Sequence, residues 1–336
     1  MAKVSVIGAG SWGTALAVLL EHNRHEVTLW SFLESEITML KEAHEQKEKL
    51  PGVKVSSNIH ITGDLEEAVR GMDVVVLAVP SAFIRSTARK CAPFAEKDQI
   101  FVDVAKGIEE GTLLTMTQVI AEEIPNANVA VLSGPSHAEE VGRGIPTTIV
   151  VGARDHATAS YLQNIFMNDK FRVYISSDMI GIELGGALKN VVALAAGAAD
   201  GLGYGDNTKA ALITRGMAEI ARLGTAMGGK YETFSGLTGI GDLIVTCASE
   251  HSRNRRAGYL IGQGYSYQEA MDQVKMIVEG VYSAKAAIAL GRKYQVSLPI
   301  IEKINEVLFG DLSAADAVKE LMLRDKTIEH TLVDWD

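Results

Sequence analysis

Short apolar runs rich in β-branched residues alternate with helix-favouring stretches up to about residue 176. The runs predict strands over residues 4–7, 26–30, 59–62, 73–80, 100–105, 129–132, 147–151 and 171–175. The stretches between them predict helices over residues 14–20, 31–50, 65–69, 83–91, 113–124 and 157–166. The strand at 73–80 is apolar without interruption, as in strands buried on both faces of a sheet. The alternation therefore predicts a doubly wound parallel sheet.

From Asp178 onward the strand signal disappears and helical periodicity takes over. Helices are predicted over residues 180–198, 207–227, 255–262, 280–294, 299–309 and 314–323. Ser266 opens a capping box with Glu269, and Ser313 is a second expected helix start. We therefore predict an α/β domain over residues 1–177, followed by an all-α domain over residues 178–336.

A glycine-rich turn joins the first predicted strand to the first predicted helix. It reads Gly8-Ala9-Gly10-Ser11-Trp12-Gly13, the G-x-G-x-x-G pattern of dinucleotide-binding Rossmann folds. Gly8 permits the tight turn, Gly10 lets a pyrophosphate approach the backbone, and Gly13 lets the helix pack closely on the strand. The free N–H groups at the helix start suit an anionic ligand. The alternative is a turn that serves packing alone.

Charge and cysteine content narrow the class of protein. The 336 residues carry a formal net charge of -10, which argues against a nucleic-acid-binding surface. Two cysteines, Cys91 and Cys247, form no disulfide framework and favour a reducing, cytoplasmic setting. Uninterrupted apolar runs such as 191–199 are about half the ~20 residues that span a bilayer, so no membrane span is expected. The charged run at 41–49 is expected to be a solvated surface.

Lys189 lies in the predicted helix 180–198 among small and apolar residues. Burying its amine in such surroundings is costly unless the amine is paired or its pKa falls. A lysine with a lowered pKa is a workable proton donor and acceptor near neutral pH. Alternatively, the side chain extends its amine to water.

A second polar residue in an apolar setting is Asp242, which opens a short helix after Gly239-Ile240-Gly241. Thr246 follows four residues later, on the same helix face. Asp242 either caps this helix or pairs with a buried cation, for which Lys189 is the candidate.

A third feature is Ser252-Arg253-Asn254, placed just before a predicted helix. A hydroxyl, a guanidinium and helix N–H groups can converge there on an anion. The alternative is a basic turn on the surface. No metal is expected, because the eight histidines, which include His137, His251 and His330, show no ligand-like spacing with one another or with cysteine.

Several further segments complete a recognisable order along the chain. They are Ala105-Lys106-Gly107-Ile108-Glu109, Ser133-Gly134-Pro135-Ser136, Leu188-Lys189-Asn190, Gly239-Ile240-Gly241-Asp242-Leu243, Ser252-Arg253-Asn254 and Val278-Glu279-Gly280. Together with the glycine turn, this order resembles the bacterial NAD(P)-dependent glycerol-3-phosphate dehydrogenases, from residue 4 to about residue 324. The resemblance implies reversible reduction of dihydroxyacetone phosphate to sn-glycerol 3-phosphate, for phospholipid synthesis.

The resemblance also implies roles for individual residues. Lys189 would be the proton acceptor in the oxidation direction, Asp242 would hold its ammonium, and Lys106 would lower its pKa. The substrate would be contacted by Lys106, Gly134, Ser136, Lys189, Asp242, Thr246, Ser252, Arg253 and Asn254. The cofactor would be lined by Gly8, Gly10, Ser11, Trp12, Gly13, Lys106, Ala138, Arg253, Ile277 and Glu279. Because these residues come from both domains, the active site is expected in the cleft between them.

One departure from the resemblance bears on cofactor choice. The family commonly has Arg or a His-Arg pair shortly after the second strand, where it meets the 2′-phosphate of NADP. Here residues 31–36 contain Glu34 and Glu36 and no basic residue. An acidic side chain there favours a free ribose 2′-OH, so we expect NADH to be used at least as well as NADPH.

Two other functions are compatible with the same pattern. One keeps the fold and changes the substrate, as in other two-domain dehydrogenases with an all-α second half. The other is a non-catalytic nicotinamide sensor, which would not need Lys189 or Asp242. In all cases the apolar helices of the second domain favour a homodimer.

Overall fold

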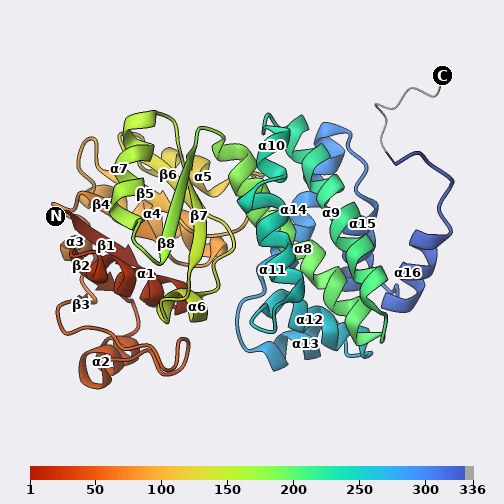
Figure 1. Cartoon of the computed structure of the whole chain (residues 1–336), viewed down its shortest axis with the longest axis horizontal. Coiled ribbons are helices and arrows are strands. Elements are labelled where there is room, and N and C mark those ends of the chain that lie inside the picture. Colours follow the sequence, from red (N-terminus) through yellow and green to blue (C-terminus); the bar gives the residue numbers. More distant parts are fainter. Residues whose placement is uncertain (330–336) are drawn as a thin grey trace.

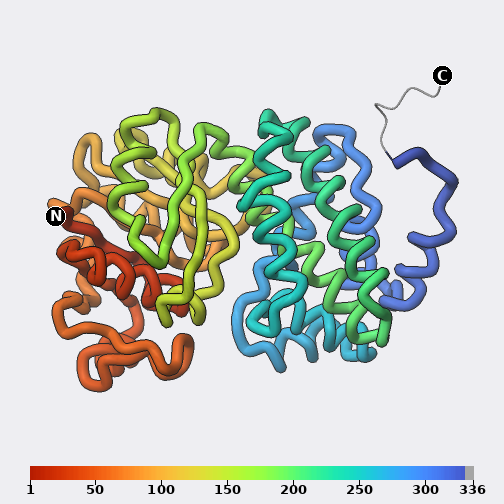
Figure 2. Tube along the Cα trace, in the orientation of Figure 1, coloured from red at the N-terminus to blue at the C-terminus, as the bar shows by residue number. Residues whose placement is uncertain are grey.

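The computed structural model describes residues 1–329 and shows two halves side by side (Figure 1). One half is a twisted sheet with helices on both faces, and the other is a bundle of helices. The N-terminus lies in the sheet half, and the chain leaves the helical half on the far side of the molecule (Figure 2). The α/β and all-α fold classes predicted from the sequence are confirmed. Residues 330–336 of the predicted second domain, including His330, lie outside the described residues.

The sheet has eight strands in the order β3-β2-β1-β4-β5-β6-β7-β8. Their bounds are β1 Lys3–Ile7, β2 Glu26–Trp30, β3 His60–Thr62, β4 Val74–Leu77, β5 Ile100–Asp103, β6 Asn128–Ser133, β7 Thr147–Ala153 and β8 Phe171–Ser176. The chain order reverses between β1 and β4, where open sheets of this kind bind ligands. The sheet is not wholly parallel, because β7 runs antiparallel to β6.

Alternate residues of the central strands face opposite helix layers. In β4, Val74 and Val76 belong to one apolar cluster, whereas Val75 and Leu77 belong to another. All four are fully buried, as the uninterrupted apolar run predicts. The first cluster includes residues of α1 Ser11–His22, α6 Ala138–Gly142 and α7 His156–Phe166. The second includes residues of α3 Leu65–Val69, α4 Ile84–Cys91 and α5 Met116–Glu123.

The segment after β2 departs from its prediction. The expected helix over 31–50 is shorter, because α2 spans only Glu34–Ala43 and His44 ends it with a left-handed φ of 50°. The chain then folds back, burying Leu50 and Gln46 completely. The Gln46 amide donates to the carbonyl oxygen of Ala9, in the glycine turn, at 3.0 Å. The charged run 41–49 is therefore only partly a solvated surface, since one polar side chain within it is part of the core.

A smaller correction concerns α5, which begins at Met116 and not at residue 113. Thr115 and Gln118 form a capping box that sets this start. The short 3₁₀ helices Ser81–Phe83 and Ala92–Phe94, which flank α4, were not predicted.

The helical half is built around α8, which spans Met179–Gly201. It is followed by α9 Asp206–Ala226, α10 Tyr231–Phe234, a π-helical turn Leu237–Gly241, α11 Asp242–Ala248, α12 Arg253–Gly262, α13 Tyr267–Val274, α14 Glu279–Tyr294, α15 Pro299–Phe309 and α16 Ala314–Met322. Helices α8 and α12 approach closely because glycines meet backbone at their contact. A Cβ on Gly197 would lie 2.0 Å from the carbonyl oxygen of Arg255, and one on Gly258 would lie 2.0 Å from that of Leu194. The capping box at Ser266 and the start at Ser313 are confirmed.

Within residues 1–329, helix α8 is long and apolar enough to cross a membrane by length and composition alone. However, 89% of its 18-residue apolar window is buried inside the protein. This burial is typical of the core helix of a globular domain, which passes the same test of length and composition.

A buried carboxylate joins α9 to the start of α15 and makes stability depend on pH. Glu219 is 2% exposed and accepts the N–H groups of Ile300 at 2.8 Å and Ile301 at 3.2 Å. Burial raises its pKa to about 7. A carboxylate whose pKa is higher in the folded than in the unfolded state destabilises the fold as pH rises from about 4.3 to about 7, here by about 4 kcal/mol.

Replacing Glu219 by Gln should remove this pH-dependent cost. The wild type loses stability as Glu219 ionises, whereas the Glu219→Gln variant does not. The melting temperature of the variant relative to the wild type is therefore expected to be a few degrees higher at pH 8.5 than at pH 5.5. Thermal unfolding at both pH values measures it. Glu232→Gln, which neutralises an exposed carboxylate on α10, is the control and should show no such change. A pH-independent difference for Glu219→Gln would contradict the prediction.

Candidate active site

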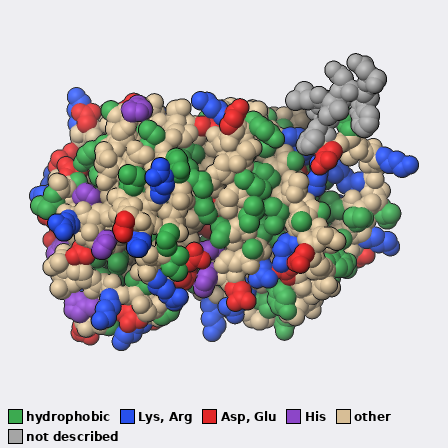
Figure 3. All heavy atoms as spheres, in the orientation of Figure 1, with side chains coloured by type: hydrophobic (Ala, Val, Ile, Leu, Met, Phe, Trp, Pro, Cys, Tyr) green, Lys and Arg blue, Asp and Glu red, His purple; other side chains and the backbone are tan. Residues whose placement is uncertain are grey.

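A cavity of about 950 Å³ separates the carboxyl edge of the sheet from the helical half. The space-filling view shows a notch at the lower edge of the molecule between the halves (Figure 3). Most of the predicted site residues line the cavity. From the sheet half these are Gly8, Gly10, Ser11, Trp12, Lys106, Ser136 and Ala138. From the helical half they are Lys189, Asp242, Thr246, Ser252, Arg253, Asn254, Ile277 and Glu279.

The glycine turn has the geometry expected of a dinucleotide site. Gly8 has a φ of 122°, and a Cβ there would lie 2.7 Å from the carbonyl oxygen of Ala78. A Cβ on Gly13 would lie 1.9 Å from the carbonyl oxygen of Gly8, so this glycine serves packing and does not line the cavity. Nothing lies within 4 Å of a Cβ on Gly10, which leaves the space that a pyrophosphate needs. The turn thus fits the pyrophosphate of a dinucleotide.

Three charged side chains from three elements meet in the cavity wall. Asp242, at the start of α11, pairs through one carboxylate oxygen with Lys189 of α8. Its other oxygen lies 2.6 Å from the Nζ of Lys106, which follows β5. Lys189 also donates to the hydroxyl of Thr246 at 2.5 Å. The Lys106 amine donates to the carbonyl oxygen of Gly134 at 2.9 Å.

This cluster decides between the alternatives left open by the sequence. Lys189 is 5% exposed and does not extend to bulk water. Asp242 is 1% exposed, and its carboxylate pairs with two amines instead of capping α11. Gly134 does not line the cavity and contributes its carbonyl oxygen, which also accepts the hydroxyl of Ser136 at 2.9 Å.

Burial is the main influence on the amine of Lys189. It lowers the pKa of Lys189 to about 7, against the opposing effect of the Asp242 carboxylate. The Lys106 ammonium adds to the lowering, as expected, but is not its principal cause. For Asp242, burial alone would raise the pKa, but the two ammonium groups outweigh it and hold that pKa below its usual range. The site therefore holds a permanent carboxylate beside an amine that exchanges its proton near neutral pH.

The start of α12 is more buried than a surface turn. Ser252 and Asn254 are 4% and 9% exposed, whereas Arg253 is exposed at the cavity. The Ser252 hydroxyl caps the helix by accepting the Arg255 N–H at 3.2 Å, which leaves its proton available to an anion. The Nη1 of Arg253 donates to the carbonyl oxygen of Ile277 at 3.3 Å. These groups surround a place suited to a phosphate.

Asn254 is already occupied by contacts within the protein. Its amide donates to Asn190 at 3.0 Å, and its side-chain oxygen accepts the N–H of Gly280 at 2.8 Å. The side chain thereby joins α8, α12 and α14 beneath the cavity. The position of this side chain depends on how three helices pack together, and the local sequence does not indicate that packing.

Sequence reasoning also missed a contact between the halves. Glu279, the first residue of α14, accepts the backbone N–H of Ser81 at 3.0 Å and pairs with the Ser81 hydroxyl. Burial raises the pKa of Glu279. The only sequence signal was the place of Ser81 at the carboxyl end of a buried strand, where parallel sheets bind ligands.

His137 and His251 both line the cavity and lie next to each other, with ring centroids 5.8 Å apart and the rings tilted by 59°. Burial lowers the pKa of His137, and the nearby Lys189 and Lys106 lower it further. Among residues 1–329 no group of three or more His, Cys, Asp or Glu is arranged to hold a metal ion.

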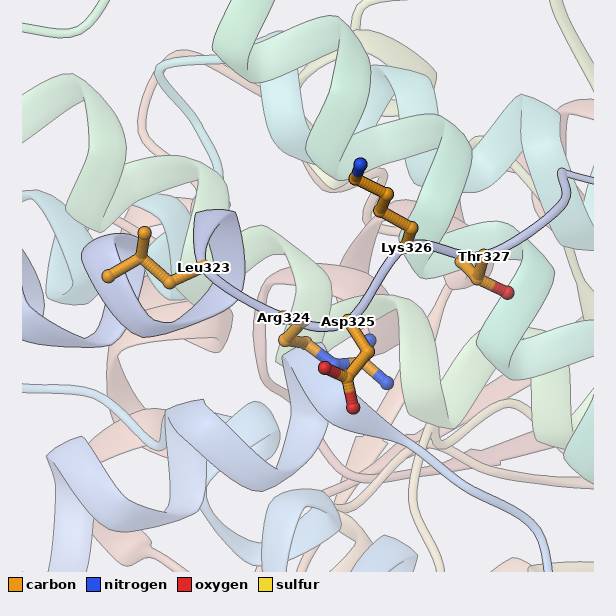
Figure 4. Close-up of a pocket in the computed structure, with 5 residues that line it drawn as sticks. All are labelled: Leu323, Arg324, Asp325, Lys326 and Thr327. Carbon is orange, nitrogen blue, oxygen red and sulfur yellow. The ribbon is translucent and has the colours of Figure 1, made fainter.

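A second hollow, after α16, lacks the features of a site. It is lined by five consecutive residues of one loop segment, Leu323, Arg324, Asp325, Lys326 and Thr327 (Figure 4). In this view the side chains of Leu323, Lys326 and Thr327 point away from one another, and only Arg324 and Asp325 extend to the same side of the chain. On the face shown in Figure 3, basic and acidic side chains are interspersed, with no basic patch that would suit a nucleic acid.

Comparison with known proteins identifies the family. Residues 3–159 match the model for the NAD-dependent glycerol-3-phosphate dehydrogenase N-terminus, and residues 178–319 match that for its C-terminus. The chain is 64% identical to glycerol-3-phosphate dehydrogenase [NAD(P)+] of Agathobacter rectalis over 335 residues, which cover all of both chains. It is 60% identical to the Fusobacterium nucleatum protein of the same name, covering 98% of this chain and 99% of that one.

A solved structure agrees with the sequence relatives. Glycerol-3-phosphate dehydrogenase of Coxiella burnetii superposes with a TM-score of 0.93 at 34% identity, covering 96% of this chain and 99% of that one. Since both family models and full-length relatives match, the chain belongs to the NAD-dependent glycerol-3-phosphate dehydrogenase family.

Proposed function

We propose that the protein catalyses reversible hydride transfer between NAD(P)H and dihydroxyacetone phosphate, giving sn-glycerol 3-phosphate for glycerophospholipid synthesis. The observation that carries this proposal is the cluster of Lys106, Lys189 and Asp242. It places an amine of lowered pKa in one cavity with a dinucleotide-type glycine turn and a phosphate-type helix start. The relatives named above carry the same activity in their names.

When bound, the nicotinamide ring supplies or accepts the hydride. In the reduction direction, negative charge develops on the carbonyl oxygen of the substrate. The Lys189 ammonium stabilises this charge and delivers the proton, and in the oxidation direction its neutral amine takes the proton from the hydroxyl. Asp242 holds the amine through its carboxylate, and Thr246 holds it through a hydroxyl. Lys106 adds a second positive charge at the other oxygen of the Asp242 carboxylate.

The phosphate of the substrate is assigned to the start of α12. Arg253, the Ser252 hydroxyl and the first N–H groups of the helix provide charge-assisted hydrogen bonds. Asn254 orients this helix start through Asn190 and Gly280. Ser136 belongs to the substrate side, and Ser11, Trp12, Ala138, Ile277 and Glu279 belong to the cofactor side of the cavity.

Three further assignments accompany this proposal. We place the boundary between a cofactor domain and a substrate domain at residue 177, between the end of β8 and the start of α8. We assign the protein to the cytoplasm, because both of its cysteines are free thiols and form no disulfide. We also propose a homodimer, supported by apolar side chains exposed on the helical half, among them Tyr231 and Ile244.

The decisive experiment follows NADH oxidation at 340 nm with dihydroxyacetone phosphate as substrate. Rapid oxidation that depends on the substrate is expected, together with formation of sn-glycerol 3-phosphate. Ketopantoate and other small 2-oxo acids are tested on the same protein as comparison substrates. They represent the alternative in which the two-domain architecture is kept and the substrate differs. No oxidation with dihydroxyacetone phosphate would refute the proposal, and tight NADH binding without turnover would favour a nicotinamide sensor.

A further inference from the structure

The ribose end of the cavity is arranged differently from what residues 31–36 indicate. In Rossmann folds, an acidic side chain near the end of the second strand commonly accepts the ribose 2′-OH. Glu36 is 4% exposed and does not present a free carboxylate there. One of its oxygens accepts the Ser31 hydroxyl at 2.5 Å, and the other pairs with the amine of Lys49.

Lys49 is brought to this place by the fold-back after α2. Gln46 bonds the carbonyl oxygen of Ala9 in the glycine turn, and its own side-chain oxygen accepts the backbone N–H of Lys49 at 3.3 Å. The Lys49 side chain remains 34% exposed and lines the cavity together with Ser31, Phe32 and Glu36. The backbone that carries Lys49 is thus tied to the turn that the pyrophosphate approaches.

Other basic side chains of the cavity belong to different walls. Lys106 follows β5, and the rest come from the helical half, namely Lys189, Arg253, Arg256 and Lys275. Within the described part of the chain, Lys49 is therefore the basic residue that the cavity has beside the end of β2. A phosphate on the ribose 2′-oxygen would meet the Lys49 ammonium together with the Glu36 carboxylate that neutralises it.

We propose that the ion pair between Lys49 and Glu36 determines the choice between NADPH and NADH. The Lys49 ammonium attracts the 2′-phosphate, and the Glu36 carboxylate opposes it by competing for that ammonium and by repelling the added negative charge. The two effects offset each other, so the protein uses NADH at least as well as NADPH although a lysine is present. The proposal rests on NAD(P) use and is independent of the substrate.

The test measures dissociation constants of NADH and NADPH by nucleotide fluorescence on the full chain. Removing the charge in Lys49→Met should weaken NADPH about tenfold and NADH less than twofold, as expected for one charge-assisted hydrogen bond. Glu36→Gln should shift the ratio in the opposite direction, tightening NADPH relative to NADH several-fold. Since both nucleotides are compared on the same sample, partial misfolding of a variant cancels from the ratio.

Lys47→Met is the matched control, because Lys47 lies two residues away on the same segment and is exposed. It should leave the ratio unchanged. The proposal is overturned if Lys49→Met weakens both nucleotides equally, or if Lys47→Met shifts the ratio as much. Because binding is measured without substrate, failure here is distinguishable from failure of the dihydroxyacetone phosphate assay.

Discussion

Lys189→Ala is expected to lower kcat for dihydroxyacetone phosphate reduction at least about a hundredfold, with NADH binding unchanged. The reason is that the variant lacks the group that delivers the proton, and positioned acid–base catalysis contributes about 10² to 10⁴ in rate. Steady-state kinetics give kcat, and fluorescence titration gives the dissociation constant for NADH. Near-normal turnover would favour a protein that senses nicotinamide without catalysis.

Two further readouts separate proton transfer from mere support of the fold. Since burial lowers the pKa of Lys189 to about 7, the wild-type reduction rate should fall as pH rises through that range, because the ammonium form is the donor. Oxidation of glycerol 3-phosphate should show the opposite trend. Lys189→Ala should lose both trends and regain activity with a small primary amine such as methylamine. Lys209→Ala, which removes a lysine paired with Asp200 on the helical half, serves as control.

The fold followed closely from local patterns. Strand 26–30 and the helices at 65–69 and 299–309 have the bounds that periodicity predicts. These segments combine strong periodicity with clear end signals, such as Asp64 as the cap of α3 and Pro299 at the start of α15. The local sequence is sufficient to predict the bounds of an element where that element contains the signals for its own start and end.

The errors share a different origin. The sequence of β7 does not indicate that it pairs antiparallel with β6. Strand direction depends on how the intervening chain returns to the sheet. The helix over 31–50 was overextended because charged residues favour helix, whereas Leu50 and Gln46 gain burial only when the chain folds back onto the glycine turn. The position of Lys49 beside Glu36 depends on the same folding back of the chain after α2, so it could not be predicted from the local sequence either.

The candidate site shows the same division. Lys189 and Asp242 could be identified from the sequence because each is a charged residue among apolar neighbours. A charged side chain buried in such a helix must have a partner. That reasoning named the pair, and Lys106 entered through the family resemblance. The contact of Glu279 with Ser81 joins residues 198 positions apart, and Asn254 is held by two other helices. The first contact arises from the docking of the two halves, and the second arises from the packing of helices α8, α12 and α14 within the helical half. Neither has a signature along the chain.

Arg253→Ala should raise the KM for dihydroxyacetone phosphate about 10- to 100-fold and change kcat much less. Arg253 is assigned to the phosphate, which does not react, so its loss removes binding common to ground and transition states. A hydrogen bond to a charged group is worth about 1.5–3 kcal/mol, which corresponds to this range. The same kinetics with unphosphorylated dihydroxyacetone should be poor in the wild type and nearly unaffected by the substitution.

Arg172→Ala, which removes a guanidinium stacked on Tyr174 in β8, is the control and should leave both substrates unaffected. The KM for NADH must be measured alongside, because Arg253 also reaches the carbonyl oxygen of Ile277 on the cofactor side. An increase in KM confined to dihydroxyacetone phosphate supports the phosphate assignment. Equal losses with the phosphorylated and unphosphorylated substrates would show that Arg253 acts on something other than the phosphate, and the start of α12 would lose its assigned ligand.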